Sequence, residues 1–315
     1  MATDLFEDNA ILEVTMTGSL TQLFRHKEDE QAFPFVLRAE GKERNIMASA
    51  RGNSRKKVCY FPPIKLEFDQ STGDDSIFSG QKSLKLVTHC NKSANAHDNL
   101  IEEFIAYRIF NLLSDASYRV RLLNINYIDT ENKRSTQKPA FVIESNKSLA
   151  QRNNGELASL PAVSLKHMND RQLALVYVFQ YLIGNTDWSL VAPSDKDNCC
   201  HNGKLIKKRN ELLYVPYDFD LSGLVNASYA RPDPSVHIKR VTQRRYRGFC
   251  LDRPTVASAL RDVKSHEVAY SDIIDSLAGL SGSAKKKAHR FLDRFFRDAS
   301  DEQQMLDSFE QRCLD

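Results

Sequence analysis

Hydrophobic and polar residues alternate over several short segments in the first half of the chain. The runs at 63–68 and 84–87 place apolar side chains on one face and charged side chains on the other, which predicts half-buried strands. The segments 119–129 and 138–145 return to this pattern. Between them, apolar residues recur every three or four positions from 98 to 113, which predicts a helix. We therefore expect a small antiparallel sheet with one helix packed on it.

The second half begins with a long apolar segment. Residues 170–183 include the run LALVYVFQYLI, apolar on nearly every side, which predicts a buried helix. Gly184 is predicted to end it, because glycine readily takes the left-handed conformation that closes a helix. Two alternating runs, 204–206 and 212–217, predict strands joined by a charged turn, and the pattern is helical from about 265 onward. This half is thus predicted to be mainly helical.

The composition is that of a globular protein. The 315 residues are 41% hydrophobic and 27% charged, enough for a sizeable core. Together with the change in pattern near residue 150, this composition predicts a β-rich lobe over 1–150 and a mainly helical lobe over 151–315. Lysine and arginine number 44 against 41 aspartate and glutamate, a net charge of +3. A protein that coats a polyanion carries a larger imbalance, so we expect no nucleic acid partner.

Neither a membrane anchor nor a disulfide framework is expected. No stretch reaches the roughly 18 consecutive apolar residues of a membrane span. The start MATDLFEDNAILEV lacks the features of a signal peptide, which favours a cytoplasmic location and leaves an exported mature form open. The cysteines are scattered with no CxxC pair, which predicts mostly reduced thiols. They are Cys59, Cys90, Cys199, Cys200, Cys250 and Cys313.

Polar residues that suit metal-dependent chemistry surround the predicted hairpin of the second half. Asp187 follows the buried helix, Asn202 precedes the first strand, and Asp218 and Asp220 follow the second strand. A hairpin returns its two ends to one edge, so we expect Asn202 and Asp218 to meet around one or two Mg²⁺ (or Mn²⁺) ions, with Asp220 as a further ligand. Carboxylate and amide oxygens suit such ions. Asp187 is left to orient or deprotonate an incoming hydroxyl group.

The first half offers residues that suit phosphate binding. Lys85 lies on a predicted strand and Glu103 in the predicted helix, and such a pair holds the α- and β-phosphates of ATP in kinases. Lys65, on the preceding strand, is an alternative to Lys85. The basic turn 51–57 is expected to cover the phosphates through its backbone N–H groups. The candidate contacts in this turn are Arg51, Asn53 and Ser54.

The order of these features resembles that of a known group of enzymes. A buried helix, a loop acid, an asparagine, a hairpin and an Asp-Phe-x motif follow one another as in protein-kinase-like enzymes. The RGNS turn, the LKLVTHC segment, the helix after it and the terminal DFD resemble the CotH family of atypical kinases, over roughly residues 45–225. The catalytic-loop arrangement is similar to that of the HipA branch of atypical kinases.

The resemblance implies a two-lobed α+β fold of the protein-kinase type, with a β-rich N-lobe carrying one helix and a mainly α C-lobe. It implies transfer of the γ-phosphoryl group of ATP, with Mg²⁺, to a hydroxyl of protein Ser or Thr; a small-molecule acceptor stays open. By this match Asp187 takes the place of the catalytic acid, and Asn202 and Asp218 those of the metal ligands. Lys85 and Glu103 take the places of the phosphate-anchoring pair.

Two other functions stay open. The step of 15 positions from Asp187 to Asn202 exceeds that of ordinary kinases, which favours a pseudokinase that binds nucleotide or a partner without transfer. DFD also matches the DxD motif of metal-dependent glycosyltransferases, although the first half lacks the βαβ series of that fold.

Several residues also have purely structural interpretations. Asp187 could cap the turn after the buried helix, and the segment 285–298 is expected to pack on the helical half. His201, beside two cysteines, is only a weak candidate for a metal ligand. Four arginines follow the acid motif, where kinases keep a substrate-facing segment, with a solvated basic strand as the alternative. They are Arg240, Arg244, Arg245 and Arg247.

Overall fold

The computed structural model describes residues 5–69, 75–195 and 198–314. The chain divides into two compact units. The first consists of Met1–Phe104 and Arg119–Ser145, and the second of Ile105–Tyr118 and Asn146–Asp315. The chain thus enters the second unit at residue 105, returns to the first unit over residues 119–145, and belongs to the second unit from residue 146 onward.

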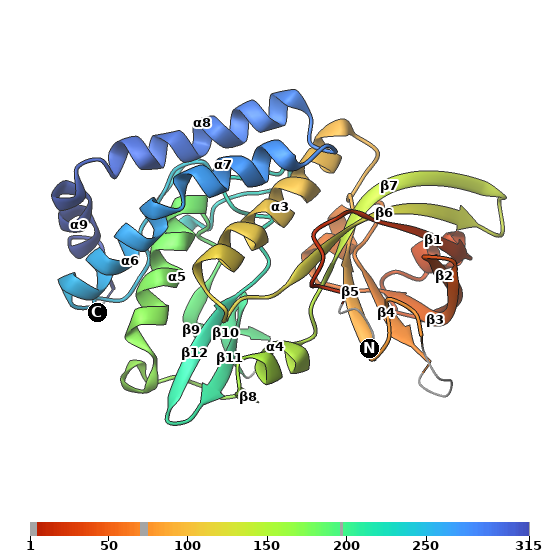
Figure 1. Cartoon of the computed structure of the whole chain (residues 1–315), viewed down its shortest axis with the longest axis horizontal. Helices are drawn as coiled ribbons and strands as arrows, with labels where there is room; N and C mark the ends of the chain where they lie inside the picture. Colours follow the sequence, from red (N-terminus) through yellow and green to blue (C-terminus); the bar gives the residue numbers. More distant parts are fainter. Residues whose placement is uncertain (1–4, 70–74, 196–197, 315) are drawn as a thin grey trace. The chain divides into compact units, whose positions relative to one another are not determined.

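The first unit is a closed barrel of seven strands (Figure 1), in the order β1-β2-β3-β4-β5-β7-β6. The strands are β1 (Leu12–Gly18), β2 (Phe33–Ala39), β3 (Lys42–Ala50), β4 (Ile64–Phe68), β5 (Ser83–Val87), β6 (Val120–Asp129) and β7 (Arg134–Ile143). Neighbouring strands pair antiparallel except β1 and β6, which pair parallel over seven residues and close the barrel. A closed sheet leaves no unpaired edge among these strands.

The expected two-lobed kinase-like fold is wrong, because the first unit is this closed barrel and not an open N-lobe sheet. The parallel pairing of β1 with β6 is the feature that overturns the expectation. It joins segments more than 100 residues apart, such as Leu12 and Leu123. Alternation along the chain predicts strands, but it carries no information on which strand lies beside which.

The barrel interior explains why the alternating segments became strands. Val14 and Met16 of β1 point inward, beside Ile125 and Tyr127 of β6 in the parallel register, and all four are buried. Each inward row alternates with residues that are more exposed, as in the burial pattern of β1. Burial of these side chains, at about 25 cal/mol per Å² of apolar surface, stabilises the closed sheet.

Three helices accompany the barrel strands in the sequence. They are α1 (Leu20–Arg25), α2 (Ser54–Val58) and α3 (Ala94–Leu113). The helix predicted over 98–113 is confirmed but begins four residues earlier, where the Ser93 hydroxyl accepts a hydrogen bond from the backbone of Ala96. The first half of α3 belongs to the first unit and its second half to the second unit.

The second unit is mainly helical (Figure 1). Its helices are α4 (Asn146–Arg152), α5 (Asp170–Ile183), α6 (Arg253–Ser265), α7 (Glu267–Ser276), α8 (Gly282–Asp298) and α9 (Glu302–Glu310). Its strands are β8 (Glu156–Ala158), β9 (Ser189–Asp195), β10 (Asn198–His201), β11 (Gly203–Lys208) and β12 (Glu211–Pro216). β12, β11 and β8 form one sheet and β9 pairs with β10. The predicted hairpin is confirmed as β11 and β12, paired antiparallel.

α5 is the buried helix that the apolar run predicted. Asn169 caps its N-terminus by accepting from the backbone of Gln172, and Gly184 ends it with a φ of 64°. The prediction for Gly184 is therefore confirmed.

α8 packs on the second unit, as the sequence predicted. Phe291 and Phe295 are buried within the unit, while the lysines and arginines of α8 lie outside or at its margin. The Arg244 guanidinium donates to the carbonyls of Leu182 and Phe291 and lies 4.1 Å from the Phe291 ring centre. Burial lowers the pKa of Arg244 to about 10. This arginine is thus a link between the end of α5 and α8, not a solvated side chain.

The prediction of mostly reduced cysteines is wrong. Disulfide bonds join Cys59 to Cys90 in the first unit, and Cys199 to Cys200 and Cys250 to Cys313 in the second. Sequence spacing does not report that the Cα atoms of Cys59 and Cys90 lie 4.5 Å apart and those of Cys250 and Cys313 4.9 Å apart, whereas Cys199 and Cys200 are neighbours in the chain. Two isolated backbone pairs bring the distant partners of two of these bonds together. Phe61 pairs with Cys90, and Phe249 pairs with Leu314.

No helix in the described parts of the chain is both long enough and apolar enough to cross a membrane.

The conformation of Gly184 gives a test of the fold. A Cβ added there would meet Phe291 Cζ at 2.9 Å, and the positive φ is unfavourable for any L side chain. We expect Gly184→Ala to lower the free energy of unfolding by about 2 kcal/mol or more. Gly282→Ala is the control, because nothing lies within 4 Å of its added Cβ. Urea denaturation of both variants checks this, and equal stabilities would contradict the packing at Gly184.

Candidate functional site

The turn after α5 holds Asp187 in a fixed position. The Asn185 side chain is buried; its oxygen accepts from the backbone N–H of Asp187 at 3.0 Å, and its amide donates to Gln180 at 3.0 Å. The indole of Trp188 donates to the Asn185 carbonyl at 3.2 Å and stacks on Tyr177. Asn185 therefore caps this turn, and the carboxylate of Asp187 is left to face other partners.

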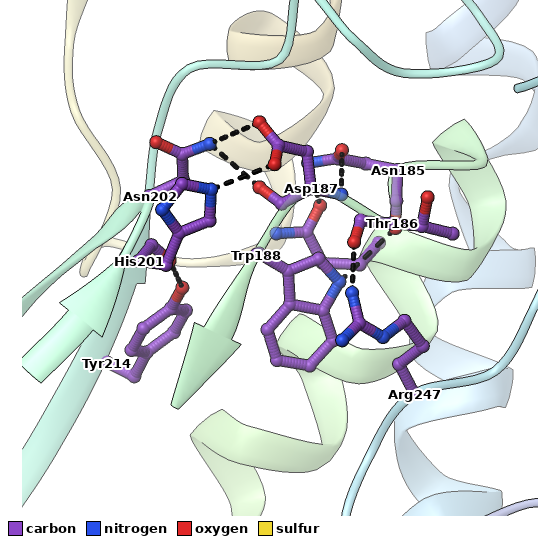
Figure 2. A network of polar contacts seen from close by, with 9 residues as sticks. Asn185, Thr186, Asp187, Trp188, His201, Asn202, Tyr214 and Arg247 are labelled. Carbon is purple, nitrogen blue, oxygen red and sulfur yellow. Dashed lines mark hydrogen bonds and ion pairs between the residues drawn. The ribbon is translucent and has the colours of Figure 1, made fainter. Parts of the chain in front are cut away.

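Both carboxylate oxygens of Asp187 are hydrogen-bonded by His201 and Asn202, which lie at the same end of the β9–β10 pair because His201 pairs with Ser189 (Figure 2). Oδ1 lies 2.8 Å from His201 Nε2, and Oδ2 accepts from Asn202 Nδ2 at 2.8 Å. The same Asn202 nitrogen donates to the Asp187 carbonyl at 2.7 Å. The Asp187 side chain remains 35% exposed, so the carboxylate is oriented but still open to a ligand.

His201 belongs to this site through its contact with Asp187, a role that the sequence did not predict. The hydrogen bond to Asp187 raises the pKa of His201, and the charges of Asp187 and Asp218 act in the same direction, while burial and Arg247 oppose them. Because an ionised carboxylate only accepts, Nε2 carries the proton in this contact. The only signal in the sequence was its position next to Asn202, and the adjacent cysteines suggested a metal instead.

The hairpin brings Asn202 and Asp218 to the same end of the sheet, as expected. Gly203 pairs with Pro216, and the Asn202 carbonyl accepts from the Tyr217 backbone at 3.1 Å. Asp218 follows directly, with its backbone N–H donating to the Tyr107 hydroxyl at 2.9 Å. Asp187, Asn202 and Asp218 are thus three sequence-predicted residues that the structure gathers in one place.

The free donor atoms at this place suit a divalent cation. Among the described residues, neither Asn202 Oδ1 nor the Asp218 carboxylate has a hydrogen-bond or ion-pair partner, and Asp218 is only half-buried. One amide oxygen and one carboxylate fit Mg²⁺, which takes its other ligands from phosphates and water. No group of three or more His, Cys, Asp or Glu side chains within the described ranges forms a metal site by itself.

Asp220 lies differently from Asp218. It is 6% exposed, and its carboxylate accepts from the Tyr229 hydroxyl at 2.8 Å. Between the two acids, Phe219 is fully buried against Tyr107 and Phe179. The two acids of the DFD motif thus lie in different surroundings, with Asp218 half-buried and Asp220 buried and hydrogen-bonded to Tyr229.

The predicted phosphate-binding lysines lie side by side on the barrel. Lys65 of β4 pairs with Lys85 of β5 in the strand register, so both are on the same face of the sheet. Lys65 Nζ lies 2.7 Å from Glu67 Oε1, and both side chains are nearly half exposed. Lys65 is exposed, whereas Lys85 is half-buried.

Glu103 forms a buried ion pair with a residue of the basic turn. Its Oε2 lies 3.0 Å from Arg55 Nη1, and Arg55 Nη2 donates to the Thr88 carbonyl at 3.1 Å. Both side chains are at most 10% exposed. Sequence reasoning missed Arg55 because a lone basic turn gives no sign that one cation points inward.

The rest of the basic turn 51–57 is divided between solvent and the protein. Residues from Ser54 onward form α2, and Lys56 lies 2.5 Å from Glu30. Arg51 is half-buried, and Asn53 and Ser54 are exposed. These three predicted contacts are accessible, whereas two of the four cations of the turn are engaged in ion pairs.

No protein-family model matches this chain, and no curated protein matches it at a significant level. The geometry around Asp187 and Asp218 is therefore the basis for assigning a function.

The Arg55–Glu103 pair gives a stability test. Glu103→Gln removes the negative charge from the buried pair with Arg55, and we expect a loss of about 3 to 5 kcal/mol in the free energy of unfolding. Glu67→Gln breaks the exposed contact with Lys65 and should cost no more than about 1 kcal/mol. Denaturation followed by circular dichroism measures both. A loss at Glu103 as small as that at Glu67 would show that the buried pair does not stabilise the first unit.

Proposed function

We propose that this protein is a Mg²⁺- or Mn²⁺-dependent phosphotransferase that moves the γ-phosphoryl group of ATP to the hydroxyl of a protein Ser or Thr. The observation that carries the proposal is that the two ends of the Asn202 amide can serve two different partners. Its amide nitrogen donates to Asp187, while its amide oxygen has no hydrogen-bond partner among the described residues, and its backbone carbonyl accepts from Tyr217, the residue before Asp218. One residue thus couples the position of an acid to that of a cation site.

In this proposal Asn202 and Asp218 hold the metal ion. When bound, the ion neutralises charge on the phosphates of ATP, which is most of what such catalysis requires. Asp218 suits the role because its backbone is anchored to Tyr107 and the neighbouring Phe219 is buried. The carboxylate is thereby held in place while remaining available to a ligand.

Asp187 is the proposed base. Its carboxylate takes the proton of the acceptor hydroxyl as the hydroxyl oxygen bonds to the γ-phosphorus, and the bond from that phosphorus to the β–γ bridging oxygen breaks to release ADP. The contacts from His201 and Asn202 hold both oxygens in a defined orientation. Positioning of this kind is the main way a protein accelerates phosphoryl transfer.

The resemblance to the CotH family supports the same activity through the RGNS, LKLVTHC and DFD segments. It also supports a role for Lys85 and Glu103 in holding the phosphates. In this proposal the Glu103 carboxylate is the counter-ion of the lysine that anchors the phosphates. Its buried ion pair with Arg55 keeps the carboxylate in place. Arg51, Asn53 and Ser54 are the accessible residues proposed to contact the phosphates from the basic turn.

Two contacts favour this function over the alternatives. The long segment between Asp187 and Asn202, which favoured a pseudokinase, contains the paired strands β9 and β10. Because the chain returns along this pair, Asn202 still donates a hydrogen bond to Asp187. The engagement of Asp220 by Tyr229 disfavours a glycosyltransferase that needs both acids of DFD on its metal.

The metal site is tested by nucleotide binding. ATP at 100 times its dissociation constant should stabilise the wild-type protein by about 2.7 kcal/mol, and only with Mg²⁺ or Mn²⁺ present. Asp218→Ala should abolish the metal-dependent part of the shift in melting temperature. Asp293→Ala, an exposed acid on α8, is the matched control. An unchanged shift in Asp218→Ala would remove this residue from the metal site.

The base is tested by phosphoryl transfer from γ-labelled ATP to the protein itself or to a Ser/Thr-rich acceptor. Asp187→Asn removes the charge but keeps the size and one accepting oxygen. It should lower transfer by about 100-fold or more while leaving Mg²⁺-ATP affinity nearly unchanged. Equal transfer by the variant would exclude Asp187 as the base. Nucleotide binding without any transfer by the wild type would instead establish the pseudokinase alternative.

A further inference from the structure

Arg247 lies against the peptide that leads into Asp187. Its Nη1 donates to the Thr186 carbonyl, which is the oxygen of the peptide bond between Thr186 and Asp187 (Figure 2). Arg247 comes from the segment between the DFD motif and α6, so it reaches the site from a different part of the chain than His201 or Asn202. The contact places the guanidinium close to Asp187.

The charge of Arg247 is incompletely paired. Among the described residues it forms no ion pair with a carboxylate, and its Nε and Nη2 donate to none of them. By contrast, the buried Arg55 has Glu103, and Arg121 has Asp8. A partly buried cation is unfavourable unless an anion or several acceptors compensate it. One carbonyl does so only in part for Arg247.

Electrostatic effects also link Arg247 to the residues around Asp187, as its contact with Thr186 does. Burial lowers the pKa of Arg247, while the charges of Asp233 and Asp187 raise it. Arg247 in turn lowers the pKa of His201. These mutual effects mean that the guanidinium lies within electrostatic range of the residues around Asp187.

We propose that Arg247 is the anion-binding residue of this site and holds the phosphoryl group that is transferred. The assignment rests on the proposed function, because ATP brings that group. A guanidinium has five N–H donors in a planar fork that matches phosphate oxygens, and one nitrogen is already fixed on Thr186. The remaining donors neutralise charge on the phosphoryl oxygens as the new bond forms, which in other phosphotransferases accelerates transfer about 10³- to 10⁵-fold.

A purely structural arginine would give different results from an anion-binding one. Arg247→Gln keeps an amide that can donate to the Thr186 carbonyl but removes the charge. Arg245→Gln is the matched control, two residues earlier in the same segment. Trp188, the only tryptophan of the chain, is buried beside Asp187, so its emission spectrum reports whether the turn is intact in each variant. An unchanged spectrum in Arg247→Gln establishes that later differences are not due to a lost turn.

The first measurement uses inorganic phosphate without any divalent ion, so that Asp218 plays no part. Calorimetric titration at low ionic strength should give the same affinity for the wild type and Arg245→Gln, and an affinity at least about tenfold weaker for Arg247→Gln. The second measurement compares Mg²⁺-ATP with Mg²⁺-ADP. Arg247→Gln should lose about tenfold in ATP affinity and little in ADP affinity, since only ATP has the γ-phosphate.

The outcomes separate this inference from the proposed function. If the wild type binds Mg²⁺-ATP and transfers phosphate, but Arg247→Gln equals it in ATP-to-ADP preference and phosphate affinity, the role of Arg247 is refuted and the function stands. If phosphate binding depends on Arg247 but the wild type binds no ATP, the function is refuted and the anion site stands. A wild-type protein that binds neither phosphate nor ATP refutes both.

Discussion

The buried C-terminal end of α5 is the constraint on which the second unit depends. The last carbonyls of a helix have no partner within it, and buried ones must be satisfied from elsewhere. Here the Ile183 and Gly184 carbonyls accept from the backbone that follows the DFD motif, and Leu182 accepts from Arg244. The same need extends to Thr186, which accepts from Arg247. The segments that satisfy these groups are those that carry the site.

This arrangement explains how residues spread over 60 positions meet. The turn after α5 presents Asp187, the β11–β12 hairpin presents Asn202 and Asp218, and the later loop presents Arg247. Each is held by a buried neighbour and keeps a polar group available, which is the usual design of a preorganised site. In the first unit, by contrast, the charges of Glu103 and Arg55 are paired with each other and buried. Arg55 is therefore not available to a ligand, although it belongs to the basic turn.

Short-range patterns predicted the parts of the structure that depend on short-range physics. An apolar run followed by glycine is a buried helix wherever it lies, and α5 with Gly184 was predicted correctly. Strand alternation separated by a charged turn likewise predicted the hairpin that brings Asn202 near Asp218. The same patterns led to the wrong fold class and the wrong cysteine chemistry. Both depend on which distant segments become neighbours, as β1 and β6 do.

The sequence by itself determined α3, α5, the β11–β12 hairpin, the order of the polar residues and three members of the candidate site. Tertiary structure alone decided that Asp220 is bound internally by Tyr229, that Arg55 is the partner of Glu103, and that His201 and Arg247 belong beside Asp187. The physical reason is that a residue type records what a side chain can bind, whereas burial and distance decide what it does bind. Those two quantities arise only when the barrel closes and the helices pack around α5.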